Sequence, residues 1–141
     1  MNNYFEVTVK FEKTSEEGKI KKVTERYLVD ALTFTEAEAR IIKEMKPFIS
    51  GEFEVANINP QKYSELFWNE KCDKWFKTKV NFIVLDEEKG VEKKVANYML
   101  VQANDLKEAR ELLVDGMKGS QADWEIASIS ETKILDVYKY I

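Results

Sequence analysis

An internal repeat is the feature of this sequence that most constrains how the chain folds. Residues 4–68 and residues 75–139 share one pattern of apolar, charged and glycine positions, interrupted by two single-residue shifts. Corresponding pairs include Val9 and Val80, Gly18 and Gly90, Leu28 and Leu100, Met45 and Met117, and Phe53 and Trp124. Agreement over about 65 aligned positions indicates a tandem duplication rather than chance.

Each repeat begins with two segments that have the period of β-strands. Residues 5–11 alternate between apolar and polar side chains, as in a strand with one buried face. Gly18 suits the tight turn that would join this strand to residues 23–31 in a hairpin. The second repeat has the same pattern, and two further strands are expected near the end of each repeat, with bulges where the alternation breaks at Ile58 and Ile129.

A helix is expected in the middle of each repeat. Thr33 and Glu36 form a capping box before an amphipathic segment, and Pro47 is expected to end that helix. Asp105 and Glu108 have the same roles in the second repeat. Each repeat is therefore predicted to have the order β-β-α-β-β.

The length of the repeats bears on how many domains the chain forms. A unit of roughly 70 residues is near the lower limit of independent stability, and 44% of the 141 residues are hydrophobic. We therefore expect an α+β fold with antiparallel sheets, two helices and pseudo-two-fold symmetry. Residues 1–141 are expected to form a single domain, in which repeats 4–68 and 75–139 share one core.

Several classes of active site are disfavoured by composition. The sequence has no histidine, which removes the commonest general base and most transition-metal sites. Its five glycines form no phosphate-binding motif, and Cys72 is the only cysteine. Glu54 and Glu125 occupy equivalent positions, and we interpret them as exposed strand glutamates rather than a metal or acid–base pair. We expect a protein without enzymatic activity, cofactor or metal.

Charge and hydropathy indicate where such a protein would act. The formal net charge of −4 argues against binding duplex DNA through overall charge. The first residues lack the basic and apolar regions of a signal peptide, and no segment approaches the roughly 20 apolar residues of a membrane span. We expect a cytoplasmic protein that does not enter a membrane.

The hairpin faces opposite the apolar ones combine lysines with aromatic residues. In the second repeat neither hairpin strand places an acid among them. Lysines can contact phosphates while aromatic rings stack on bases, as in proteins that bind single-stranded nucleic acid. The candidate contact residues are Tyr4, Lys10, Lys22, Arg26, Trp75, Lys77, Lys79, Lys94 and Tyr98.

Other interpretations of these faces stay open. Lysines commonly guard exposed strands against aggregation, and outer-face aromatics often belong to a dimer interface. Our leading hypothesis is a non-enzymatic protein that binds single-stranded DNA or RNA, as a monomer or homodimer. The alternative is a protein-interaction module, such as an adaptor or an inhibitor of a host system.

Two resemblances extend this hypothesis. The run Thr35-Glu36-Ala37-Glu38-Ala39-Arg40 and the run Glu125-Ile126-Ala127-Ser128-Ile129-Ser130-Glu131-Thr132 resemble a family of unknown function found in Bacteroides-type gut bacteria and their crAss-like phages. This family implies a small phage or mobile-element protein, acting in the host cytoplasm if phage-encoded, and brings no catalytic residues. The predicted β-β-β-β-α order from residue 53 to the helix at Asp105 is similar to that of Whirly and Pur-alpha proteins, which bind single strands on sheet surfaces.

Overall fold

The computed structural model describes residues 3–140 and confirms the α+β class. The described residues form two helices and two four-stranded sheets. The elements in chain order are β1 (Tyr4–Thr14), β2 (Ile20–Asp30), α1 (Phe34–Met45), β3 (Phe53–Gln61), β4 (Glu65–Phe67), β5 (Lys74–Asp86), β6 (Val91–Ala103), α2 (Leu106–Gly116), β7 (Asp123–Glu131) and β8 (Ile134–Tyr138). Neither helix within residues 3–140 has the length and apolar character needed to cross a bilayer.

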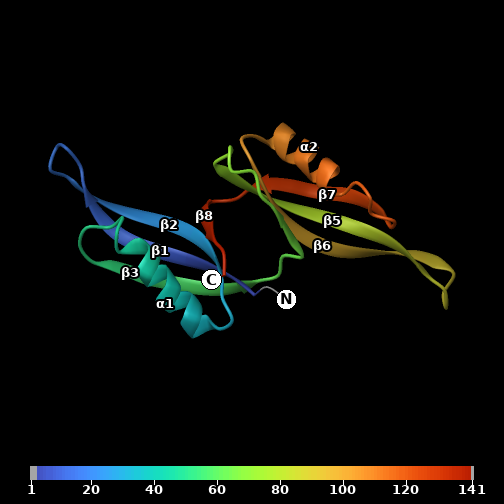
Figure 1. The fold of residues 1–141 in the computed structure, drawn as a ribbon, viewed down its shortest axis with the longest axis horizontal. Helices are drawn as coiled ribbons and strands as arrows, with labels where there is room; N and C mark the ends of the chain where they lie inside the picture. Colours follow the sequence, from blue (N-terminus) through green and yellow to red (C-terminus); the bar gives the residue numbers. More distant parts are fainter. Residues whose placement is uncertain (1–2, 141) are drawn as a thin grey trace. The chain divides into compact units, whose positions relative to one another are not determined.

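The chain divides into two compact units. Unit 1 contains the residues up to Lys62 together with those from Lys133 onward, and unit 2 contains Tyr63–Thr132. The sheet of unit 1 has the strand order β3-β1-β2-β8, and the sheet of unit 2 has the order β4-β6-β5-β7. Figure 1 shows β8, the last strand of the chain, beside β2 in the sheet of unit 1.

The last strand of each sequence repeat therefore belongs to the unit built mainly from the other repeat. Strand β8 pairs in parallel with β2, from Arg26 to Val29, and β4 pairs in parallel with β6, from Met99 to Val101. The predicted β-β-β-β-α run does not form one sheet, because β3 lies in unit 1 and β4 lies in unit 2. The short segments between these strands lead directly from one sheet to the other.

The two long hairpins form as the alternating pattern predicts. Strands β1 and β2 pair from Tyr4 opposite Asp30 to Thr14 opposite Ile20. Strands β5 and β6 pair from Lys74 opposite Ala103 to Asp86 opposite Val91. At the two turns Gly18 and Gly90 have φ values of 79° and 65°, which side chains with a Cβ rarely adopt.

Both helices begin at the predicted caps. The Thr33 side-chain oxygen accepts a hydrogen bond from the Glu36 backbone N–H at 3.1 Å, and the Asp105 carboxylate accepts one from the Glu108 N–H at 2.8 Å. Helix α1 ends at Met45, two residues before Pro47. These bonds satisfy amides that have no partner within the first helical turn.

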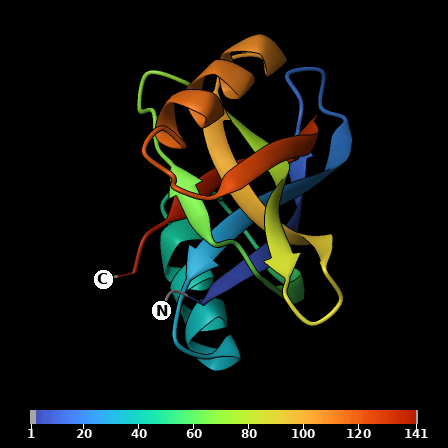
Figure 2. The same ribbon diagram turned by 90° about the vertical axis from the view of Figure 1, so that its right-hand side faces the viewer.

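Each helix covers one face of the sheet in its own unit (Figure 1 and Figure 2). The buried side chains under α1 are Phe5, Val7, Val9, Tyr27, Val29, Ala31, Ala37, Ile41, Met45, Ile49 and Ile58. Those under α2 are Phe76, Val80, Met99, Val101, Ala103, Ala109, Leu113 and Met117. The buried side chains under the two helices thus form two clusters, because each helix packs on the sheet of its own unit.

The expected bulges occur two residues earlier than predicted. The pairing of β1 with β3 shifts between Thr8 and Val9, and Ala56 of β3 has no partner at that step. The pairing of β5 with β7 shifts in the same way at Ala127. Beyond each bulge the apolar residues of β3 and β7 return to the helix-covered face.

Candidate nucleic-acid interface

The face of unit 2 opposite α2 brings together several of the predicted contact residues. Phe76 and Val80 of β5 point toward α2, so Lys77 and Lys79 lie on the opposite face. We call this surface the outer face of unit 2. Across β6 and β7 the neighbours of Lys77 and Lys79 are Leu100, Tyr98, Ser130 and Ser128. At these two levels of the sheet the three strands carry two lysines and no carboxylate.

Two aromatic rings lie close to the ammonium group of Lys77. Its Nζ lies 5.0 Å from the centre of the Tyr98 ring and 5.9 Å from that of Tyr63. A cation at this distance from a ring is attracted by the negative face of the π system. The Tyr98 side chain is also 37% exposed, so it remains accessible to a ligand.

Lys94 has a counter-ion that the sequence analysis missed. Its Nζ lies 2.7 Å from Glu125 Oε1, and the Asn81 amide donates a hydrogen bond to the same carboxylate at 3.4 Å. The hydrogen bond with Glu125 raises the pKa of Lys94, and the same bond lowers the pKa of Glu125. The sequence pattern predicts no acid among the lysines of the two hairpin strands. The acid that pairs with Lys94 lies instead on β7, the third strand of the sheet. The recurrence of glutamate at positions 54 and 125 was the only signal for it.

Two of the predicted aromatic contacts are not accessible. Trp75 is 1% exposed and packs edge-on against Trp68, with ring centres 5.0 Å apart. Tyr4 is 8% exposed. Neither ring offers a face on which a base can stack, so both predictions are wrong. The alternating pattern gave the correct side of the sheet for both residues. They lie at the beginning of β1 and β5, however, where side chains on the outer side are buried as well, and an alternating pattern does not report this.

The corresponding face of unit 1 mixes basic and acidic side chains. Lys10, Lys22 and Arg26 are exposed there, as predicted. Arg26 forms an ion pair with Glu6 at 3.4 Å, whereas no ion pair of residues 3–140 involves Lys10 or Lys22. The same face also presents Glu12 and Glu54. Three basic side chains and the acidic side chains of Glu6, Glu12 and Glu54 therefore share the outer face of unit 1, together with the buried Asp30.

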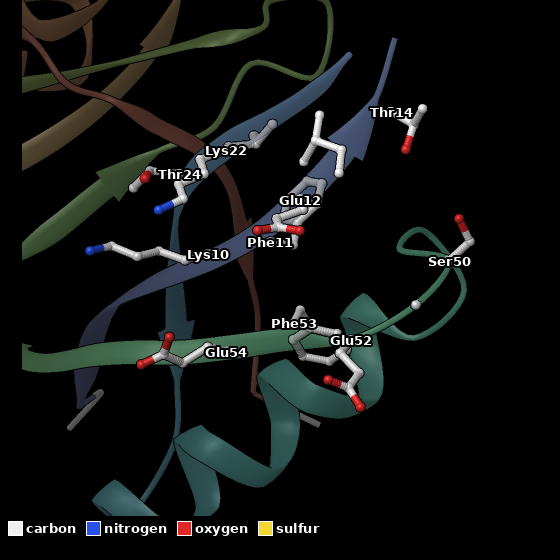
Figure 3. A pocket seen from close by; sticks show the side chains of 13 residues that line it. Lys10, Phe11, Glu12, Thr14, Lys22, Thr24, Ser50, Glu52, Phe53 and Glu54 are labelled. Atoms are coloured by element: carbon white, nitrogen blue, oxygen red, sulfur yellow. The ribbon is translucent and has the colours of Figure 1, made fainter. Parts of the chain in front are cut away.

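A groove of about 840 Å³ lies at the distal end of the β1–β2 hairpin. Figure 3 shows Lys10, Lys22 and Glu54 pointing to the same side of the sheet. Phe11 and Phe53 line the groove from the helix-covered side, where they pack against the cluster under α1. The charged side chains that line it are Lys10, Lys22, Glu12, Glu52 and Glu54. With two lysines and three glutamates, the groove does not favour a polyanion.

The only cysteine is held as a neutral thiol. Cys72 is 3% exposed, and its thiol donates a hydrogen bond to Glu108 Oε1 at 3.0 Å. This bond and burial raise the pKa of Cys72 to about 11. A thiol in this state is a poor nucleophile at neutral pH. No group of three or more side chains able to hold a metal ion occurs within residues 3–140.

Comparison with known families places the whole described chain in one of them. A family model described as a domain of unknown function, DUF4494, matches residues 3–140. The protein belongs to the DUF4494 family. The resemblance to a family of unknown function is confirmed at this level. No curated protein matches the chain.

The outer face of unit 2 has three lysines, hydroxyl groups and an accessible tyrosine, and its three acids, Glu92, Asp123 and Glu125, lie away from the levels of Lys77 and Lys79. The outer face of unit 1 mixes basic and acidic side chains, and a groove with both polar and apolar lining lies at the distal end of its hairpin. The two faces therefore differ in how their charges are distributed, although the two repeats of the sequence correspond.

Proposed function

We propose that this DUF4494 protein binds single-stranded DNA or RNA on the outer face of unit 2, without catalysing a reaction. The observation that supports this most is the pair Lys77 and Lys79 on a part of the sheet that carries no carboxylate. Lys94 extends the basic character along β6 and shares its charge with Glu125. The family resemblance adds the proposal that the protein has a phage or mobile-element origin and acts in the cytoplasm.

The chemistry of this face suits an unpaired strand. Lysine ammonium groups contact phosphates, and a base stacked on an aromatic side chain contributes about 1–3 kcal/mol. Tyr98 is the accessible ring, and the hydroxyls of Ser128 and Ser130 can donate to phosphate or sugar oxygens. Because backbone contacts dominate, we expect little sequence preference.

Unit 1 carries other side chains at the positions of the two β5 lysines. Glu6 and Thr8 stand at the positions that correspond to Lys77 and Lys79. Exchanging a glutamate and a threonine for two lysines raises the charge at these two positions by three, whereas Asn81 and Tyr98 stand where unit 1 has Lys10 and Arg26. Lys77 and Lys79 thus stand together on one strand, away from the acids of the same face, whereas the basic and acidic side chains of unit 1 are interspersed.

The test is a fluorescence-anisotropy titration of a labelled mixed-sequence single strand, with a duplex of the same sequence as the control. We expect binding at low salt that prefers the single strand. With three lysine contacts, the logarithm of the binding constant should fall with the logarithm of salt concentration with a slope of about −2. No binding at low salt would refute the proposal.

A matched pair of variants locates the site. Lys79→Glu should abolish binding, whereas Lys10→Glu, the same change on the outer face of unit 1, should reduce it at most a few fold. Both residues lie on strand surfaces, so thermal stability should stay nearly unchanged. Equal losses in the two variants would show that net charge rather than the outer face of unit 2 determines binding.

The groove of unit 1 favours a second candidate function, binding of a protein partner. Half-buried Phe11 and Phe53, exposed Ile20 and an excess of glutamate suit a basic segment with apolar side chains. An adaptor or an inhibitor of a host system would use such a surface. The check is a pull-down from nuclease-treated lysate with the wild type and with Ile20→Asp. A partner retained by the wild type and lost by Ile20→Asp supports this function, whereas equal capture refutes the groove.

A further inference from the structure

The edge of β6 is unpaired along half of its length. Strand β4 covers only Met99–Val101, and within residues 3–140 no strand lies beside residues 91–97 on that side. Residues 91–96 are all exposed. Figure 1 shows this part of the β5–β6 hairpin extending beyond the helix-covered part of the sheet. A row of unsatisfied backbone groups of this kind is a template for another strand.

The direction of the free backbone groups follows from one hydrogen bond. The Ser64 N–H donates to the Tyr98 carbonyl at 2.8 Å, on the edge that faces β4. Backbone groups alternate in direction along a strand, so Glu92, Lys94 and Ala96 also direct their N–H and C=O groups to this edge. An antiparallel partner must therefore place residues of the same parity opposite one another.

Exposed apolar side chains flank the free edge. Val91 is 53% exposed and Val95 is 40% exposed, and both lie on the face that α2 covers farther along the sheet. Val84 on the neighbouring strand is 40% exposed, and Leu85 is 65% exposed. In unit 1 the corresponding hairpin has one strongly exposed apolar residue, Ile20. The hairpin of unit 2 thus exposes more apolar side chains than the hairpin of unit 1.

We propose that β6 pairs with β6 of a second copy of this chain, antiparallel and centred on Lys93. This register places Val91 opposite Val95 twice and Glu92 opposite Lys94 twice. The pairs of Glu92 with Lys94 are those that exchange backbone hydrogen bonds, because both residues direct their backbone groups to the edge. Lys94 has three donors, so it serves Glu125 and the partner's carboxylate together.

Neighbouring registers are less favourable. A shift of two residues in one direction places Lys94 opposite Lys94 and Val95 opposite Lys93. The opposite shift places Glu92 opposite Glu92 and Val91 opposite Lys93. Like charges directly opposite one another destabilise an antiparallel pair, and opposite charges stabilise it. In the proposed register only Lys93 faces a like charge, at the symmetry axis.

The pairing uses the edge of the sheet rather than its outer face, and Lys94 is the one residue that takes part both in this pairing and in the proposed nucleic-acid binding. The resulting interface is isologous, as in most homodimers. An edge of seven residues buries little surface, so we expect a weak, concentration-dependent dimer. Sedimentation velocity over a concentration series is the direct measurement.

Lys93 provides a test that depends on the register. Mixing wild-type protein with Lys93→Glu protein places the lysine of one chain opposite the introduced carboxylate of the other at the symmetry axis. We expect the mixture to associate about three- to tenfold more tightly than either protein alone. If the mixture associates no more tightly than the separate proteins, the register is wrong.

A second variant tests the edge itself. Val95→Asp should abolish self-association while circular dichroism and thermal stability stay close to the wild type, because Val95 is exposed. Ile20→Asp, at the exposed hairpin of unit 1, is the matched control and should leave self-association unchanged. A wild type that remains monomeric at high concentration, or loss of the dimer in Ile20→Asp alone, would overturn the proposal.

Discussion

Replacing Tyr138 with alanine tests whether β8 stabilises unit 1, as the strand order requires. The half-buried Tyr138 ring packs on the buried cluster under α1, and its centre is 5.8 Å from that of Tyr27. Burial raises its pKa to about 12, as expected for a phenol partly withdrawn from water. Truncating a fully buried aromatic residue costs about 3–5 kcal/mol. For a half-buried ring, including loss of the aromatic pair, we expect about 2–3 kcal/mol.

Hydrogen exchange measured by NMR locates this loss within the molecule. The amides of β1 and β2 should exchange about 30- to 150-fold faster in Tyr138→Ala, because each 1.4 kcal/mol corresponds to a factor of ten. Tyr140, which is 48% exposed, provides the control, and Tyr140→Ala should change exchange by less than about threefold. Faster exchange in β5 and β7, with β1 and β2 unaffected, would refute the assignment of β8 to unit 1.

Three further predictions test local features of the fold. A Cβ at Gly116 would lie 2.4 Å from the Phe67 ring of β4, so Gly116→Ala should lower the melting temperature of the wild type but not of Phe67→Ala protein. The Cys72 thiol, with its pKa raised from 9.0 to about 11, should react with iodoacetamide at pH 8 about a hundredfold more slowly than an exposed thiol, and Glu108→Gln should speed the reaction. Unchanged reactivity in Glu108→Gln would contradict the role of that hydrogen bond. Removing the helix cap with Thr33→Ala should cost about 1 kcal/mol in chemical denaturation, whereas Thr35→Ala, inside the first turn, should cost less.

Local structure was largely predictable from the sequence. The period-two runs gave the two hairpins, and Thr33 and Asp105 gave the helix starts, because these signals depend on residues close in the chain. The assignment of β4 and β8 to sheets was not predictable. An alternating pattern reports which face of a strand is buried, but it contains no information on which sheet edge the strand joins.

The candidate interface was predictable to a similar degree. Alternation placed Lys77, Lys79 and Tyr98 on one face, and the register of β5 and β6 confirms that they share it. The same alternation placed Trp75 there, although the structure buries it. The counter-ion Glu125 depends on the third strand of the sheet, whose neighbour a sequence pattern does not identify.

The most direct test of the proposed function is a nitrogen–proton correlation spectrum of the protein, titrated at low salt with a mixed-sequence single strand. The account predicts shift changes at residues 77–81 and 94–98, on the outer face of unit 2. Residues 8–12 and 22–26, on the outer face of unit 1, should change little. Changes confined to unit 1, or none at all at saturating strand concentration, would contradict the account.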